Sequence, residues 1–174
     1  MTIVKANALA DMPGNEVHIC YTNKGGYPDK IVHPISDKVH VHAAGDIFEI
    51  INIRNFLLRQ WQLRKRIKSL IAEIQPDVVI STGKAEKHAL STIRTKAVKI
   101  REYHTASSVF RMSLMDATFR ERVVEWFETH IESFFFDKVY LLTKEDKEAW
   151  FKNNKKFDYQ YNACSFPIQD VLPQ

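Results

Sequence analysis

Short runs of β-forming residues alternate with stretches of helical periodicity along this chain, and that alternation limits its possible folds more than any other feature. The two apolar runs at 78–80 and 139–142 are hydrophobic on both faces, as strands covered by helices on both sides are. Alternating β and α elements are typical of βαβ units. We therefore predict an α/β fold of Rossmann-like, three-layer α/β/α form with a mainly parallel sheet. The strand candidates are 16–22, 38–42, 77–81, 97–102, 138–142 and, more weakly, 158–164.

Helical periodicity predicts five helices between these strands. A helix begins at once, over 1–10, and a long amphipathic helix over 52–75 ends at Pro76. The remaining helices are expected over 85–93, 116–135 and 144–153, the last with Thr143 as its N-cap. The long helix should bury one apolar side that includes Leu57. We expect the aromatic residues near the fourth helix to pack in the core: Trp126, Phe127, Phe134, Phe135 and Phe136.

The composition fits one ordinary globular domain. With 174 residues, of which 45% are hydrophobic, the chain can close a single core. No window approaches the ~18 consecutive apolar residues of a membrane span, and the first residues do not form a secretory signal. Cys20 and Cys164 lie far apart in apolar runs. They predict two buried thiols in a reducing cytoplasm rather than a disulfide or a Cys-rich zinc site.

Positive charge gathers on the long helix. The net charge is +4, and no acidic residue occurs between Ile50 and Ala72. Three interpretations stay open: a solvated helix face, a contact with anionic lipid headgroups, and a contact with nucleic-acid phosphates. Trp61 beside the apolar stripe favours the membrane surface over nucleic acid. The residues predicted to make this contact are Arg54, Arg59, Lys65 and Arg66.

Polar residues follow several of the predicted strands. In open parallel sheets, ligands bind beyond the carboxyl ends of the strands. Hydroxyl, amide, carboxylate and imidazole groups there suit a polyhydroxylated ligand such as a sugar, although helix capping also explains several of them. His104 can exchange a proton near neutral pH, and Glu102 lies two residues earlier. The candidates are Glu102 and His104 as the catalytic pair, and Ser81, Thr82, Gly83, Lys84, Thr22 and Asn23 as substrate-binding residues.

Other chemistry leaves little trace in the sequence. Neither a phosphate-binding loop, nor a dinucleotide-binding glycine pattern, nor a nucleophile elbow occurs. His40 and His42 alternate on one strand, with His18 and His33 nearby, and such spacing can seed a metal site. Because no carboxylate or thiolate cluster accompanies them, we predict no metal ligand, and no cofactor in this domain.

Four segments, taken in order, resemble the amino-terminal half of family 4 glycosyltransferases. They are 9–19 (LADMPGNEVHI), 74–81 (IQPDVVIS), 100–104 (IREYH) and 136–146 (FDKVYLLTKED). Together they cover about residues 1–164, which we take as one domain. The resemblance implies half of a two-domain GT-B enzyme that transfers a sugar, of hexosyltransferase type, from a nucleotide-sugar donor with retention of configuration.

The resemblance also implies roles and a location. This half would mainly bind the acceptor, with His104 near the transferred sugar, while the other half holds the nucleotide-sugar donor. Many members work at the inner membrane face on lipid-linked or lipopolysaccharide acceptors in polysaccharide and glycolipid synthesis. We therefore expect a cytoplasmic protein with peripheral membrane contact through the basic helix, and a sugar or glycolipid acceptor as its partner.

The sequence departs from the family at both ends. A first strand with its glycine-rich loop and the nucleotide-sugar domain have no counterpart here, and 165–174 matches the start of an interdomain linker. We expect a fragment that is inactive alone, with a vacant central position in its sheet that favours low stability or a homodimer. The alternative is a non-enzymatic α/β binding module whose basic helix contacts nucleic acid, which is less favoured, or another anionic partner.

Overall fold

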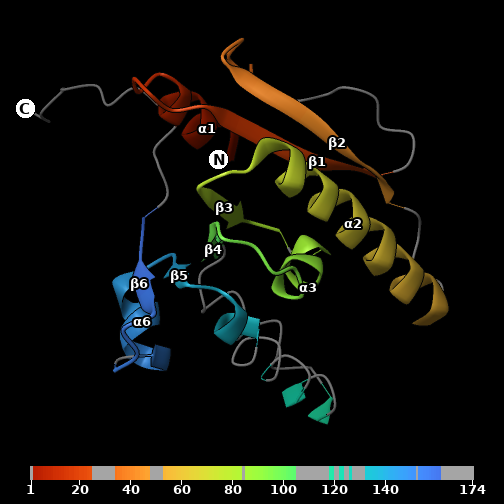
Figure 1. Ribbon diagram of the computed structural model, residues 1–174. Helices are drawn as coiled ribbons and strands as arrows, with labels where there is room; N and C mark the ends of the chain where they lie inside the picture. Colours follow the sequence, from red (N-terminus) through yellow and green to blue (C-terminus); the bar gives the residue numbers. More distant parts are fainter. Residues whose placement is uncertain are drawn as a thin grey trace, which may run out of the picture.

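The chain forms helices and parallel strands that alternate along most of its length (Figure 1). The computed structural model describes residues 2–24, 34–47, 53–83, 85–104, 118–119, 122–123, 126, 132–151 and 153–161. This arrangement confirms the predicted α/β class. The elements are α1 (Thr2–Ala10), β1 (Val17–Lys24), β2 (Val39–Ile47), α2 (Ile53–Ile74), β3 (Val78–Ser81), α3 (Ala85–Ser91), β4 (Val98–Glu102), the 3-10 helix η1 (Glu132–Phe135), β5 (Lys138–Leu141), α6 (Lys144–Phe151) and β6 (Phe157–Tyr159).

The strands divide between two sheets. β1 pairs with β2, and the other four strands follow in the order β3-β4-β5-β6. Every pairing among the described strands is parallel, with Val17 opposite Val39 in the first sheet and Val78 opposite Val98 in the second. The sequence predicts one mainly parallel sheet. The described strands instead form two sheets, in which β1 and β3 do not pair with each other.

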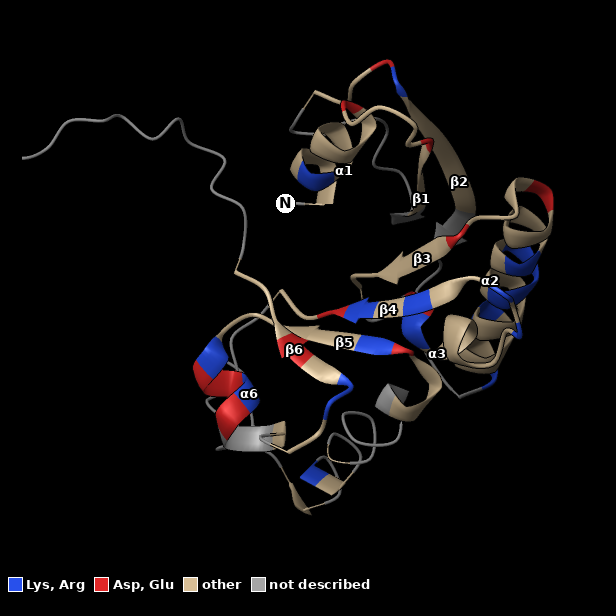
Figure 2. Ribbon diagram, turned by 60° about the vertical axis from the view of Figure 1, so that its left-hand side comes forward, with Lys and Arg blue, Asp and Glu red and all other residues tan. Residues whose placement is uncertain are grey.

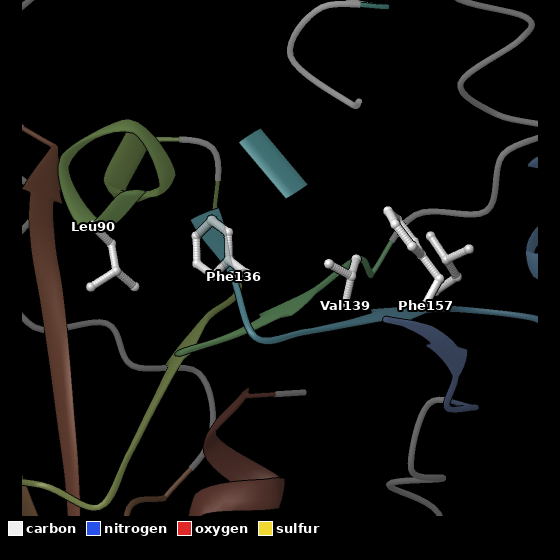
Figure 3. Close-up of a cluster of buried hydrophobic side chains, with 5 residues drawn as sticks. Leu90, Phe136, Val139 and Phe157 are labelled. Atoms are coloured by element: carbon white, nitrogen blue, oxygen red, sulfur yellow. The ribbon is translucent and has the colours of Figure 1, made fainter. Parts of the chain in front are cut away.

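The main hydrophobic core belongs to the four-stranded sheet. Leu90 of α3 packs with Phe136, Val139 and Phe157, and all four are almost fully buried (Figure 3). Helices α2 and α3 lie against each other, and Ile67 of α2 also contacts this cluster (Figure 1). Burial of these side chains holds β5 and β6 against the helices.

The two-stranded sheet has a smaller core of its own. Ala6 and Ala10 of α1 pack against Val39 of β2, with Val17 and Ile19 of β1 at the edge of the cluster. Because strand side chains alternate between faces, α1 covers the face that carries Val17, Ile19 and Val39. The opposite face carries the residues between them.

Local signals set the ends of the helices much as predicted. The Thr143 hydroxyl accepts a hydrogen bond from the backbone N–H of Asp146 (3.1 Å), so Thr143 is the N-cap of α6. Gln75 closes α2 in a left-handed conformation, with φ of 51°, directly before Pro76. The predicted helix over 116–135 falls mostly outside the described residues, and its last turn is η1.

Three expectations about burial are wrong. Trp126, Phe134 and Phe135 are 52–70% exposed, so of the described aromatic residues in that group only Phe136 joins the core, while Phe127 lies outside the described residues. Leu57 is exposed on α2 because the helix turns its Leu63 and Leu70 side inward. Cys20 is exposed rather than buried, and Cys164 lies outside the described residues.

Candidate functional site

Glu102 and His104 come together at the carboxyl end of β4, as the sequence predicts. The Nε2 atom of His104 lies 3.9 Å from Oε2 of Glu102. The Glu102 side chain is only 7% exposed, whereas that of His104 is 27% exposed. The carboxylate is therefore held inside the protein, whereas part of the imidazole reaches the solvent.

Lys5 of α1 completes this group. Its ammonium donates a hydrogen bond to Oε1 of Glu102 and forms an ion pair with it. Each Glu102 oxygen thus faces a different neighbour, Lys5 on one side and His104 on the other. A buried carboxylate needs such partners, because its desolvation is costly.

A second polar network fills the end of β3. Nη1 of Arg101 donates to the Ser81 hydroxyl (2.7 Å) and to the Gly83 carbonyl (2.6 Å). The Glu86 carboxylate of α3 accepts from the Ser81 hydroxyl (3.2 Å) and from the backbone N–H groups of Thr82 (3.1 Å) and Gly83. Ser81 and Arg101 are buried. These residues therefore form a hydrogen-bonded network at the carboxyl end of β3.

This network restricts what the predicted substrate-binding residues can do. The Ser81 hydroxyl already has a donor and an acceptor inside the protein. A Cβ atom at Gly83 would lie 2.7 Å from a Glu86 oxygen, so glycine permits the close approach of that carboxylate. The Arg101 guanidinium also stacks over Tyr103, 4.9 Å from the ring centroid. The loop after β3 is thereby held in place beside Glu102 and His104.

Three predicted residues cannot be placed as side chains. Thr22 and Asn23 belong to β1, but their side chains lie outside what the structure describes. Lys84 lies outside the described residues altogether. The carboxyl ends of β3 and β4 therefore make up the site as it is described.

The basic helix α2 presents a mixed outer face. Figure 2 shows its basic residues spread along the helix. Arg54, Lys65 and Arg66 are exposed, and Arg59 is partly so; the Arg66 Nε donates to the Ala43 carbonyl (3.3 Å). Leu57, Leu58 and Trp61 are 47–60% exposed on the same helix, and the Lys65 ammonium lies 5.6 Å from the Trp61 ring. The outer face therefore combines cations with large apolar side chains.

A pocket lies between α2 and the residues that follow α3. Its volume is about 380 Å³, and Arg64, Lys68, Thr92, Ile93 and Arg94 line it. The Nε of Arg64 donates to the Thr92 hydroxyl (3.0 Å). Three cations surround this pocket, so it suits an anion, and it lies apart from Glu102 and His104.

Sequence reasoning missed Lys5, Glu86 and Arg101. Arg101 lies two residues after Lys99 on β4, in a sheet that is predicted to have helices on both faces. A charged residue in such a strand indicates a buried partner. Glu86 stands in the first turn of α3, where a carboxylate meets unpaired backbone N–H groups. Lys5 is the only charged residue of α1, but nothing local indicates its contact with β4.

Comparison with known proteins adds no family to these observations. A scan against models of protein families gives no match for the chain, and a search of curated proteins gives no relative. Within the described residues, no helix combines the length and apolar character needed to cross a bilayer. The resemblance to glycosyltransferases therefore stays a prediction from the residues.

Proposed function

We propose that this chain is the acceptor-side half of a retaining glycosyltransferase that uses a nucleotide-sugar donor. The observation that carries the proposal is the series Lys5, Glu102 and His104 at the carboxyl end of β4. It offers a partly exposed imidazole, backed by a buried carboxylate, where parallel α/β sheets bind their ligands.

In this proposal His104 contacts the reacting sugar through a hydrogen bond to a hydroxyl group. Glu102 is a positioning residue, because its carboxylate faces the imidazole while Lys5 neutralises its charge. The acceptor hydroxyl attacks the anomeric carbon as the bond to the nucleotide phosphate breaks, and its proton passes to the departing phosphate oxygen. Positioning of the acceptor and hydrogen bonds to developing charge would supply the rate enhancement. The donor would be bound by a second domain, and this half would supply no cofactor.

The split sheet supports the same assignment. β1–β2 and β3–β6 are two parallel sheets in one chain, with edges at β1 and β3 that the described residues do not pair. An additional central strand, as the resemblance implies for the family, would join them into one doubly wound sheet. A Rossmann-like half described without that strand would show two separate parallel sheets, as this chain does.

A sugar-transfer assay tests the assignment. The protein is expressed with any sequence that flanks residues 1–174 in its gene. Transfer of labelled sugar from a set of nucleotide-sugar donors to a membrane lipid extract would be followed for the wild type, His104→Ala and Lys144→Ala. We expect His104→Ala to lower turnover by at least ~100-fold, the usual effect of losing a proton-transferring or hydrogen-bonding side chain. Lys144 is an exposed side chain on α6, away from β4, so Lys144→Ala should keep wild-type turnover. Wild-type turnover in His104→Ala overturns the role of His104, and no transfer from any donor overturns the enzyme class.

The outer face of α2 supports peripheral membrane contact as part of this proposal. Exposed Leu57, Leu58 and Trp61 would enter the headgroup region, while Arg54 and Lys65 pair with anionic lipids. Flotation with vesicles of phosphatidylcholine and phosphatidylglycerol should recover the wild type, and less of Trp61→Ala or Lys65→Glu. Lys144→Glu, an equal charge change on exposed α6, should float like the wild type. Equal recovery with vesicles of phosphatidylcholine alone would contradict an electrostatic contact.

The pocket beside α2 favours a second candidate function, a non-enzymatic module that binds an anionic partner. Arg64, Lys68 and Arg94 concentrate positive charge there. A gel-shift titration with single- and double-stranded nucleic acid would detect binding driven by phosphates, which falls steeply as salt is raised. Arg94→Glu should abolish such a shift, and Lys144→Glu should not. No shift at low salt would remove nucleic acid as the partner.

A further inference from the structure

Three histidines gather on one face of the two-stranded sheet. His18 of β1 is opposite His40 of β2, and the next residue pair on that face is Cys20 with His42. Partners in a parallel pair point the same way, so all three imidazoles lie on the face opposite the α1 cluster. The His18 ring stacks on both neighbours, with ring centroids 4.7 Å from His40 and 5.2 Å from His42.

Glu16 adds a carboxylate to this group. Its Oε1 lies 3.0 Å from Nε2 of His18 and 3.9 Å from Nε2 of His40. The donor atoms of Glu16, His18 and His40 all lie within 4.8 Å of one another. The sequence alone predicts no metal ligand here, because no carboxylate cluster accompanies the histidines along the chain. The fold supplies that carboxylate from the residue that precedes β1.

His42 fixes the orientation of the central imidazole. Its Nε2 lies 2.9 Å from Nδ1 of His18, within hydrogen-bond distance. When His18 Nδ1–H donates to His42, the lone pair of His18 Nε2 points toward Glu16 and His40. A ligating histidine characteristically uses its second ring nitrogen in this way, with an outer partner that holds the ring.

We propose that Glu16, His18 and His40 form a binding site for a divalent transition-metal ion of the Zn²⁺ class. Two imidazole nitrogens and one carboxylate oxygen are ligands that Zn²⁺ prefers, while Mg²⁺ and Ca²⁺ prefer oxygen ligands throughout. Bonds of about 2.0–2.2 Å place tetrahedral ligands about 3.3 Å apart, so the donor atoms need only small shifts in separation, while the stacked His40 ring must rotate to direct its Nε2 at the ion. More than half of the His40 side chain is exposed, as is most of Glu16, so both can turn toward the ion. Water completes the coordination.

The ion would link β1 to β2 directly. Two parallel strands with one covered face are marginally stable by themselves, and the α1 cluster is built largely of alanine. Ligands on both strands would add a cross-link on the uncovered face. The site does not depend on the proposed sugar transfer, since His104 and Glu102 belong to the other sheet.

Titration of the tag-free protein with Zn²⁺ by calorimetry tests this proposal, followed by Co²⁺ absorption in the visible range. We expect one ion per chain and a higher melting temperature with Zn²⁺ but not with Mg²⁺. His18→Ala and His40→Ala should weaken Zn²⁺ binding by more than ~100-fold, and His42→Ala by about 10–100-fold, as for outer partners of metal ligands. Nitrogen NMR of the histidine rings should show the ion on Nε2 of His18 and His40.

Two control variants separate the site from general metal adsorption. His104→Ala removes a histidine outside the group, and Cys20→Ser removes the cysteine on the same face; both should bind Zn²⁺ like the wild type. If His18→Ala fails to fold by far-ultraviolet circular dichroism, the exposed changes Glu16→Gln and His40→Ala carry the test. No Zn²⁺ binding by the wild type, or unchanged binding in both Glu16→Gln and His40→Ala, overturns the proposal.

Discussion

The two sheets of this protein are stabilised in different ways. The four-stranded sheet packs against a core of large side chains, and its Phe136 and Val139 are at most 1% exposed. The two-stranded sheet has a cluster whose buried members are Ala6, Ala10 and Val39. Buried apolar area is the main source of stability. The larger sheet should therefore have a higher free energy of unfolding than the smaller one. The smaller sheet depends more on polar contacts.

This difference separates two kinds of chemistry as well. On the larger sheet, charged groups such as Arg101 and Glu102 are buried and held by several partners, which gives fixed geometry. On the smaller sheet, Glu16 and His40 are exposed and can move toward a ligand. A rigid site and an adaptable one therefore occur in the same short chain.

The largest effect should follow removal of the central aromatic ring of the main core. Phe136→Ala should lower the free energy of unfolding by about 3–5 kcal/mol, because it leaves a cavity among Leu90, Val139 and Phe157. Urea unfolding followed by circular dichroism measures this change. Phe134 is 70% exposed, so Phe134→Ala should change stability by less than about 0.5 kcal/mol. Equal losses in the two variants would contradict the burial pattern.

A smaller loss is expected when the ion pair between α1 and β4 is broken. Lys5→Met leaves the Glu102 carboxylate buried without its ammonium partner, and should cost about 2 kcal/mol of unfolding free energy. A double-mutant cycle with Glu102→Gln measures the coupling. Lys38 pairs with Asp11 in an exposed position, so Lys38→Met should leave the urea midpoint unchanged. A zero coupling energy would mean that α1 and β4 are energetically independent.

Matched valine changes sharpen the contrast between the sheets. Val39→Ala should cost about 1.5 kcal/mol and speed hydrogen exchange in α1, β1 and β2, leaving β3–β6 protected. Val139→Ala, the same change in the main core, should speed exchange throughout β3–β6. Loss of protection in all six strands from Val39→Ala would show that the sheets unfold as one unit.

The smallest effect concerns the thiol of the smaller sheet. Although Cys20 is exposed in part, burial of its thiol raises the pKa above the ordinary 9.0, and Arg66 opposes this shift. At a pH below its pKa the thiol is protonated and unreactive. In a Cys164→Ser background, alkylation of Cys20 by iodoacetamide should therefore be slower than alkylation of glutathione. The rate should increase as the pH is raised beyond 9. Arg66→Gln should slow it further, and Arg54→Gln should not. A thiol that reacts fully at neutral pH would contradict the shift.

Much of the fold could be predicted because its signals are local. The runs around Val78 and Val139 are apolar and β-branched, and Pro76 and Thr143 mark helix ends through their own backbone chemistry. The division into two sheets could not be predicted with equal certainty, since it depends on which strand edges meet. Exposure of Trp126 and Phe134 was missed because aromatic content reports hydrophobicity and not position.

The candidate site could be predicted only in part, for a related reason. Glu102 and His104 are near in sequence, so their proximity follows from one strand end. Lys5 reaches Glu102 from the first helix, and Glu86 reaches Ser81 from a different element, so both contacts depend on packing between elements. Sequence spacing carries no direct information on such contacts.

The position of Glu102 has a mechanical consequence. One carboxylate contacts a side chain of α1 through one oxygen and faces the imidazole of His104 with the other. A displacement of α1 would therefore pull on Lys5, rotate the carboxylate and change the direction in which His104 points. The Glu102 side chain thus couples the position of the first helix to the end of β4.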